Sequence, residues 1–310
     1  MEFRLLTEDS EKLRFVNGWE HAFSRSFEMR DYEWIFDSRN LIYGAFDQET
    51  LCAGYCILQS QAVFQGNLVK SGLCNNVFVT PEYQGCHLFT KLGRYVLSAA
   101  GEMGIQILIG MPNESSLPGH RRVGWTTFPP NFYLEKKIIE DESVTQLEDE
   151  SITPITSLNF PLWKEAFNEF AFKISFGRSF SIIKEADYFS WRYLNRPSGD
   201  YKIFIYQEKG AVKGYVVYKY YQPFKRIHIL DVEAENETVF FELLKTSGTI
   251  KESVSLINVL SSTIYADYFS RAGYCISAEY SNLIAHDPLS KAPVSLGDTC
   301  NLVIGDNEVF

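Results

Sequence analysis

The hydrophobic positions between residues 75 and 110 change from a period of two to a helical period and back. Alternation over residues 75–80 predicts a strand, because successive side chains of a strand point to opposite faces. Residues 88–104 carry apolar side chains three or four positions apart, which predicts a helix, and the run 106–110 predicts a buried strand. Together these elements predict a βαβ unit.

The same order of elements is predicted twice along the chain. Helical stretches and alternating runs fall at 13–27, 41–46 and 52–58, and again at 162–172, 201–206 and 214–218. The segment Ala53-Gly-Tyr-Cys-Ile-Leu58 corresponds to Lys213-Gly-Tyr-Val-Val-Tyr218, and Val123-Gly-Trp125 corresponds to Ala272-Gly-Tyr274. An internal duplication with insertions explains both correspondences and predicts an α+β fold.

Length and charge place a boundary between the two repeats near residue 140. The chain has 310 residues, 45% of them hydrophobic, which is enough for two domains with buried cores. Few core residues lie between Ile139 and Pro154, and this segment is the predicted linker. Its carboxylates are Glu140, Asp141, Glu142, Glu148, Asp149 and Glu150. We therefore expect domains at 1–140 and 141–310.

Composition argues against several classes of protein. The net charge of -10 repels nucleic acid and anionic membrane surfaces, so neither is an expected partner. No stretch approaches the about 18 apolar residues of a spanning helix, and residues 1–9 lack the pattern of a secretory signal. We expect a cytoplasmic protein. Six scattered cysteines and five histidines lack zinc-ligand spacing, so no metal site is predicted.

A loop joins the predicted strand 75–80 to the predicted helix 88–104. The N-terminus of a helix binds anions, because its first backbone N–H groups lack intrahelical partners and the helix dipole is positive there. The loop is therefore a candidate site for a pyrophosphate.

Residues 77–92, Val-Phe-Val-Thr-Pro-Glu-Tyr-Gln-Gly-Cys-His-Leu-Phe-Thr-Lys-Leu, resemble the acyl-CoA signature of the GNAT superfamily of N-acyltransferases. In that family a strand ends in a Pro-x-Tyr segment, and Gln/Arg-x-x-Gly-x-Gly/Ala opens the helix beneath the CoA pyrophosphate. Gln84 matches the first position of this motif, whereas His87 and Phe89 replace the two later small residues.

A second motif supports the resemblance. The family places an Asn at the end of the next strand, a Tyr seven residues later, and Gly-Phe after that. Asn113, His120, Gly124 and Trp125 fall at those four positions. Two motifs in register identify the first half of the chain as similar to GNAT domains.

The resemblance implies two tandem GNAT-like domains, each a central mixed, mostly antiparallel sheet flanked by helices. The first would bind acyl-CoA as co-substrate, its strand N–H groups holding the pantetheine and its loop N–H groups the pyrophosphate. The second would be a degenerate repeat that contributes to the acceptor cleft. The implied acyl-CoA contacts are Val77, Phe78, Val79, Tyr83, Gln84, Gly85, Cys86, His87, Leu88, Phe89, Thr90, Asn113 and Ser116.

Tandem chains of this length resemble the sugar N-acyltransferases that acylate dTDP-linked amino-dideoxy sugars in polysaccharide biosynthesis. Trp191 and Arg192 are candidates for binding such a nucleotide, because a ring stacks on a base and a guanidinium pairs with phosphate. Their alternative role is internal packing. Another amine or peptide acceptor, or a non-catalytic acyl-CoA-binding module, remains open. The acyl group, acetyl or 3-hydroxyacyl, and the oligomeric state are not indicated.

The candidate catalytic residues follow from the same resemblance. His120 occupies the position of the family's thiolate-protonating Tyr, and its alternative is a surface histidine. The family's carboxylate base is replaced by Asn75 and Asn76, either of which could hold a water, with Asn75 also facing the acceptor. Asp231, on the equivalent strand of the second repeat, is a second candidate base, and its alternative is a strand-end residue.

Overall fold

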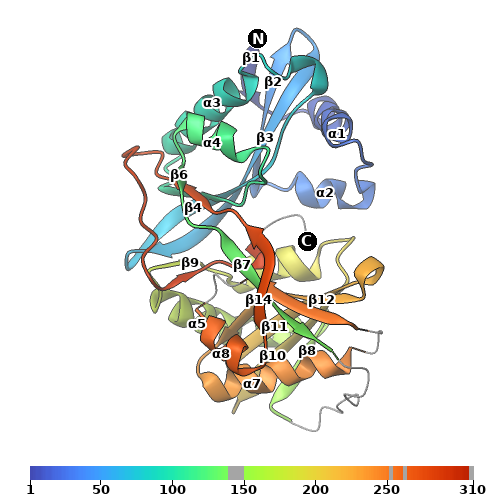
Figure 1. The fold of residues 1–310 in the computed structure, drawn as a ribbon, viewed down its shortest axis with the longest axis vertical. Coiled ribbons are helices and arrows are strands. Elements are labelled where there is room, and N and C mark those ends of the chain that lie inside the picture. The colour runs from blue at the N-terminus through green and yellow to red at the C-terminus, as the bar shows by residue number, and fades with distance from the viewer. Residues whose placement is uncertain (139–149, 251–253, 261–263, 307–310) are drawn as a thin grey trace. The chain divides into compact units, whose positions relative to one another are not determined.

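The structure is a computed structural model that describes residues 1–138, 150–250, 254–260 and 264–306 (Figure 1). Its chain divides into two units that do not follow one cut in the sequence. Unit 1 comprises Met1–Ala62, Leu68–Pro130 and Asn282–Ser295, and unit 2 comprises Val63–Asn67, Asn131–Ser281 and Leu296–Phe310. The boundary predicted at residue 140, and all the predicted linker carboxylates except Glu150, lie outside the described residues.

Unit 1 is built on one mixed sheet with the strand order β1-β2-β3-β4-β5-β15-β6. Neighbouring strands are antiparallel except β4 and β5, which are parallel. The elements are β1 (Glu2–Leu5), α1 (Asp9–Phe23), α2 (Tyr32–Ile35), β2 (Asn40–Asp47), β3 (Thr50–Phe64), β4 (Asn67–Val79), the short 3₁₀ helix η2 (Pro81–Tyr83), α3 (Leu88–Glu102), β5 (Ile107–Gly110), α4 (Leu117–Val123), β6 (Thr126–Thr127) and β15 (Ile284–His286).

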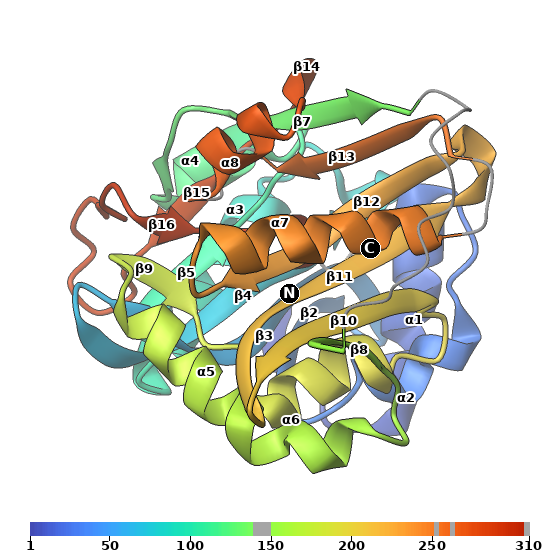
Figure 2. The same ribbon diagram turned by 90° about the horizontal axis from the view of Figure 1, so that it is seen from below.

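Unit 2 is built on a second mixed sheet with the strand order β14-β7-β13-β12-β11-β10-β8. Here too one pair is parallel, β12 with β13. The elements are β7 (Asn131–Lys137), β8 (Ile152–Ile155), α5 (Lys164–Phe176), β9 (Phe180–Ile182), α6 (Ala186–Phe189), β10 (Tyr201–Glu208), β11 (Ala211–Tyr221), β12 (Arg226–Ala234), α7 (Glu237–Lys245), β13 (Leu256–Leu260), α8 (Ala266–Arg271), β14 (Cys275–Ser281) and β16 (Cys300–Asn301). Helix α7 packs along β10, β11 and β12 (Figure 2).

Each unit is completed by a strand from the other half of the chain. Strand β7 directly follows β6 of unit 1 in sequence but pairs with β13 and β14 in unit 2. Strand β15 lies near the C-terminus but pairs with β5 and β6 in unit 1. In both units the added strand runs antiparallel to the second member of the parallel pair. Because of this exchange, β5 in unit 1 and β13 in unit 2 each have a hydrogen-bonded strand on both sides.

The predicted elements are confirmed, although β4 begins at Asn67, well before the expected residue 75, and β3 continues to Phe64, beyond the expected residue 58. Apolar side chains at Leu88, Leu92 and Val96 form the buried face of α3, as the helical period predicts. Helix α1 begins earlier than expected and ends at Phe23, because Ser24 has a left-handed backbone with φ of 51°. The predicted α+β fold with two mixed, mostly antiparallel sheets flanked by helices is confirmed.

Within the part of the chain that the structure describes, no helix has the length and apolar character needed to span a bilayer.

The exchanged strand β15 should contribute strongly to the stability of unit 1. Ile284 is fully buried in the core beneath α3, so Ile284→Ala is expected to lower the free energy of unfolding by about 2–5 kcal/mol. Ile276→Ala, at a position 75% exposed on β14, serves as the control and should change it by about 0.5 kcal/mol or less. Equal effects of the two substitutions in urea denaturation would contradict this role of β15.

Candidate active site

The parallel strands β4 and β5 pair over only part of their length. Their register runs from Ser71 opposite Ile107 to Cys74 opposite Gly110, where it ends. Two residues further along β4, Asn76 has a left-handed backbone with φ of 46°, which interrupts the regular strand. The edge of β4 from Asn75 to Val79 therefore continues beyond its pairing with β5. Peptide groups along such an edge are able to bind an extended ligand.

A well-anchored loop follows the end of β4. The Thr80 backbone N–H donates to the Cys52 carbonyl oxygen at 2.9 Å, and the Gln84 side-chain amide donates to the Val79 carbonyl oxygen at 3.2 Å. The Tyr83 hydroxyl donates to the Asp47 carboxylate at 3.1 Å. These contacts fix the start of the loop while residues 84–87 remain exposed.

The loop leads into the N-terminus of α3, which has no side-chain cap. Gly85 and His87 both have left-handed backbones, with φ of 78° and 58°, and His87 makes no side-chain cap on α3. Leu88 is buried and anchors the first turn. The first N–H groups of α3 are therefore available to an anion, and the helix dipole adds to the attraction. This is the arrangement predicted for residues 84–90.

The corresponding helix in unit 2 has a side-chain cap at its N-terminus. Helix α7 follows β12 as α3 follows β4, and its cap is Asn236. The Asn236 side-chain oxygen accepts the Val239 backbone N–H at 3.1 Å, and so fills the place an anion would take. Unit 2 therefore has a side-chain cap at the position that corresponds to the open N-terminus of α3.

The predicted asparagines all have partners within unit 1. Asn76 accepts a hydrogen bond from Trp19 Nε1 at 3.0 Å and donates to the Asn75 side chain at 3.4 Å. The Asn113 side chain accepts the Ser116 backbone N–H at 2.9 Å, which starts the turn leading into α4. These contacts orient Asn75 and Asn76 at the irregular part of β4. Their roles toward water, acceptor and acyl-CoA, and those of Asn113 and Ser116 toward acyl-CoA, stay predictions.

His120 lies inside unit 1 and not on its surface. It is 3% exposed and is surrounded by the rings of Tyr55, Phe89 and Trp125, at centroid distances of 6.2, 5.0 and 5.5 Å. Burial lowers the pKa of His120 to about 4. The imidazole is therefore neutral at pH 7. The neutral ring can still donate or accept a hydrogen bond. It is not an imidazolium, so it cannot act as a cationic acid toward a leaving thiolate.

Two further polar residues in this cluster were not selected from the sequence. The buried Tyr55 hydroxyl interacts with the Cys74 thiol and with the Trp125 side chain, whereas His120 Nδ1 is buried without a hydrogen-bond partner among the described residues. Tyr55 had appeared only as part of the internal repeat, and Trp125 only as a motif position. Burial raises the pKa of Tyr55 well above its ordinary value, and the nearby Cys74 thiol raises it further.

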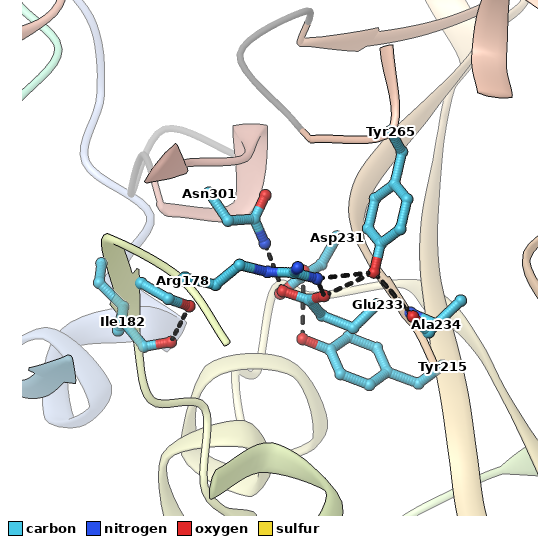
Figure 3. A network of polar contacts seen from close by, with 9 residues as sticks. Arg178, Ile182, Tyr215, Asp231, Glu233, Ala234, Tyr265 and Asn301 are labelled. Atoms are coloured by element: carbon cyan, nitrogen blue, oxygen red, sulfur yellow. Dashed lines mark hydrogen bonds and ion pairs between the residues drawn. The ribbon is translucent and has the colours of Figure 1, made fainter. Parts of the chain in front are cut away.

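Asp231 occupies the interior of unit 2. Its oxygens accept from the Tyr193 hydroxyl at 3.0 Å and the Tyr215 hydroxyl at 3.2 Å, and Lys184 Nζ lies 2.8 Å away. Figure 3 shows Asp231 and Tyr215 beside a second buried group, in which Glu233 contacts Arg178, Tyr265 and Asn301. The described contacts of Asp231 are those of an internal ion pair. Its role as a base stays a prediction.

The candidate nucleotide-binding pair is also buried in unit 2. Trp191 is 5% exposed and Arg192 is 1% exposed. Arg192 Nε donates to the Gly305 carbonyl oxygen at 3.1 Å, and Arg192 Nη1 donates to the Tyr201 hydroxyl at 3.4 Å. This agrees with the alternative of internal packing, and nucleotide recognition by these residues stays a prediction.

Unit 1 also has an open cavity of about 750 Å³ next to the loop. It is lined by α1, the turn between β2 and β3, and residues 80–83. Glu49 and Glu82 line it, paired with Arg14 at 2.8 Å and with His21 at 3.1 Å respectively. Across the described residues, histidines, cysteines and carboxylates form no group suited to hold a metal ion.

A known family model matches the part of the chain that contains this loop and helix α3. Residues 2–128 match the model of the acetyltransferase (GNAT) domain. The match covers β1 to β6 and includes the loop, α3 and His120. No curated protein matches this sequence.

Solved structures resemble nearly the whole chain at low sequence identity. A conserved Enterococcus faecalis protein of unknown function, described as a probable N-acyltransferase, is 18% identical with a TM-score of 0.72; the match covers 94% of this chain and 74% of that one. A GCN5-related N-acetyltransferase from Anabaena variabilis is 15% identical with a TM-score of 0.69, covering 93% and 73%. One from Kribbella flavida is 15% identical with a TM-score of 0.65, covering 92% and 71%. These similarities show a shared fold.

The buried position of His120 predicts an unusual titration. Since the folded pKa of about 4 lies below the unperturbed value near 6.5, the stabilisation from keeping His120 neutral is present above pH 6.5 and is lost as the pH falls toward 4. Histidine NMR signals, assigned with a His120→Gln variant, should show His120 titrating near pH 4. A midpoint near 6.5 would contradict the burial.

Proposed function

We propose that this chain, whose residues 2–128 form a GNAT acetyltransferase domain, is a CoA-dependent N-acyltransferase that moves an acyl group from acyl-CoA to the amino group of a small molecule. The acyl-CoA would lie on unit 1, with its pyrophosphate at the N-terminus of α3 and its pantetheine along the unpaired edge of β4.

The observation that carries the proposal is the uncapped N-terminus of α3 behind an anchored loop. The corresponding helix α7 caps itself with Asn236, whereas His87 leaves the first turn of α3 open. A phosphate group bound there would accept hydrogen bonds from backbone N–H groups at the positive end of the helix dipole. The edge of β4 beyond Cys74 leads into the loop that precedes this helix.

The reaction needs a neutral amine and a stabilised leaving group. An amine with a pKa of about 8 is partly neutral at pH 7, so a strong base is not required. A water oriented by Asn75 or Asn76 would take the proton from the attacking nitrogen. The transfer is direct, from thioester to amine, and forms no covalent intermediate with the protein.

The acceptor we propose is a nucleotide-linked amino-dideoxy sugar. The support is the resemblance of the tandem arrangement to sugar N-acyltransferases. Acetyl and 3-hydroxyacyl groups are the donors to compare. A different cationic amine is the second candidate, because the chain carries a net charge of -10 and Glu49 and Glu82 line the cavity beside the loop.

Mass spectrometry of reaction products tests the acceptor. The protein would be incubated with acetyl-CoA or 3-hydroxybutyryl-CoA and with dTDP-3-amino or dTDP-4-amino dideoxy sugars, a polyamine or a peptide. We expect one acyl mass added to the nucleotide sugar. An acylated polyamine or peptide alone would replace the proposed acceptor, and CoA binding without any product would contradict acyl transfer.

A charge placed in the loop tests the pyrophosphate site. Cys86 is exposed in the loop, so Cys86→Asp should weaken CoA binding about tenfold through repulsion of the phosphates. Ser98→Asp adds the same charge at an exposed position further along α3 and should change affinity less than about twofold. Calorimetry measures both affinities, and equal effects of the two variants would place the phosphates elsewhere.

A further inference from the structure

Two adjacent asparagines of β4 lie on the same face of the unit 1 sheet. Cys74 and Val77 both pack against the hydrophobic cluster beneath α3. In a regular strand, side chains three positions apart point to opposite faces, so one extra residue separates these two. The left-handed backbone of Asn76, with φ of 46°, marks that extra residue. Asn75 and Asn76 therefore both lie on the face of β4 that is turned away from α3.

Helix α1 packs on that face of β4. The Phe78 ring lies 5.1 Å from the ring of Phe15 and 6.3 Å from the ring of Phe23, measured between centroids. A Cβ added to Gly18 would lie 3.0 Å from the Phe78 ring, so α1 and β4 are in close contact. This packing places Trp19, the next residue of α1, beside the irregular part of β4.

Trp19 decides the orientation of the Asn76 side-chain amide. It is 7% exposed, and its ring lies 5.1 and 5.7 Å from the rings of Phe23 and Phe27. Trp19 Nε1 donates to Asn76 Oδ1 at 3.0 Å. Because an indole N–H can only donate, the Asn76 atom that faces it must be the amide oxygen. The Asn76 amide nitrogen is then left to donate to Asn75 Oδ1 at 3.4 Å.

The series of hydrogen bonds from Trp19 through Asn76 ends at Asn75. Among the described residues the Asn75 side chain makes no other hydrogen bond, and it is partly exposed. Its amide oxygen has a second lone pair, which can accept a hydrogen bond from a water molecule. A water held in this way keeps a lone pair of its own for the proton of an amine.

We propose that Trp19 is a positioning residue for acyl transfer, which acts through Asn76 to hold Asn75 against the water that deprotonates the amine. This inference rests on the proposed function and selects Asn75 over Asn76 as the residue that contacts this water. The amine lone pair forms the new N–C bond, and the C–S electron pair passes to sulfur. The water accepts the nitrogen's proton and passes it to solvent, and CoA leaves as the thiolate.

Substitution of the indole tests the positioning role. Trp19→Phe removes the N–H donor and keeps an aromatic ring, so the Asn76 amide can turn its oxygen toward Asn75. We expect kcat to fall about tenfold, with acetyl-CoA and the dTDP-4-amino dideoxy sugar, polyamine or peptide that the protein acylates. The KM for acetyl-CoA should change less than about twofold. The matched control is Trp163→Phe, the same change at a partly exposed position in unit 2, which should keep kcat within about twofold.

A double-mutant cycle separates positioning from packing. Asn76→Gly keeps a residue that adopts positive φ and removes the side-chain amide, so kcat should again fall about tenfold. Since Trp19 is proposed to act through Asn76, Trp19→Phe added to Asn76→Gly should lower kcat by no more than about twofold. The indole N–H NMR signal of Trp19 should also shift in Asn76→Gly, because its acceptor is gone.

The outcomes separate this inference from the proposed function. An unchanged kcat in Trp19→Phe, or losses that multiply in the double variant, would overturn the positioning role while acyl transfer by the wild-type protein stands. A wild-type protein that acylates none of these amines would overturn the proposed function and this inference with it. Circular dichroism checks that each variant is folded. If Trp19→Phe does not fold, Asn76→Gly decides the question, and an unchanged kcat or Trp19 signal there overturns the inference.

Discussion

The candidate site in unit 1 depends on one constraint, which is that the parallel strands β4 and β5 stop pairing before β4 ends. Strands β4 and β5 pair only as far as Cys74 and Gly110, so β4 continues beyond this pairing to Val79. The anchored loop and the uncapped α3 follow within a few residues. Because the edge, the loop and the helix N-terminus are consecutive in the chain, a single extended ligand with an anionic end can contact all of them.

The two units share a framework but differ in a few side chains that decide whether a helix N-terminus is capped. Unit 2 also has a parallel pair followed by a helix, but Asn236 caps α7 and Asp231 accepts the Tyr215 hydroxyl. In unit 1 the equivalent positions are an uncapped helix and Tyr55, whose hydroxyl interacts with Cys74 and Trp125 in place of a carboxylate. A helix N-terminus that is capped by a side chain of the same chain has fewer N–H groups to offer an anion, whereas an uncapped one can bind it.

Burial changes the chemistry expected of the residues that the motifs select. His120 stands at the family's tyrosine position, but its aromatic surroundings keep it neutral, so a role as cationic acid does not follow from its position. Arg192 likewise has its guanidinium bound to the Gly305 carbonyl oxygen and the Tyr201 hydroxyl. The residue type selects what a side chain can do, and its neighbours decide which of those roles is available.

The sequence by itself determined the elements, the α+β class, the repeat and the loop at the N-terminus of α3, because period, turn residues and motif spacing are local properties. Tertiary structure alone decided the exchange of β7 and β15, which depends on pairing between residues more than 100 positions apart. It also decided the burial of His120, Asp231 and Arg192 and the position of Tyr55 beside Trp125. Exposure and pKa depend on neighbours that come from distant segments, and no local pattern in the chain records them.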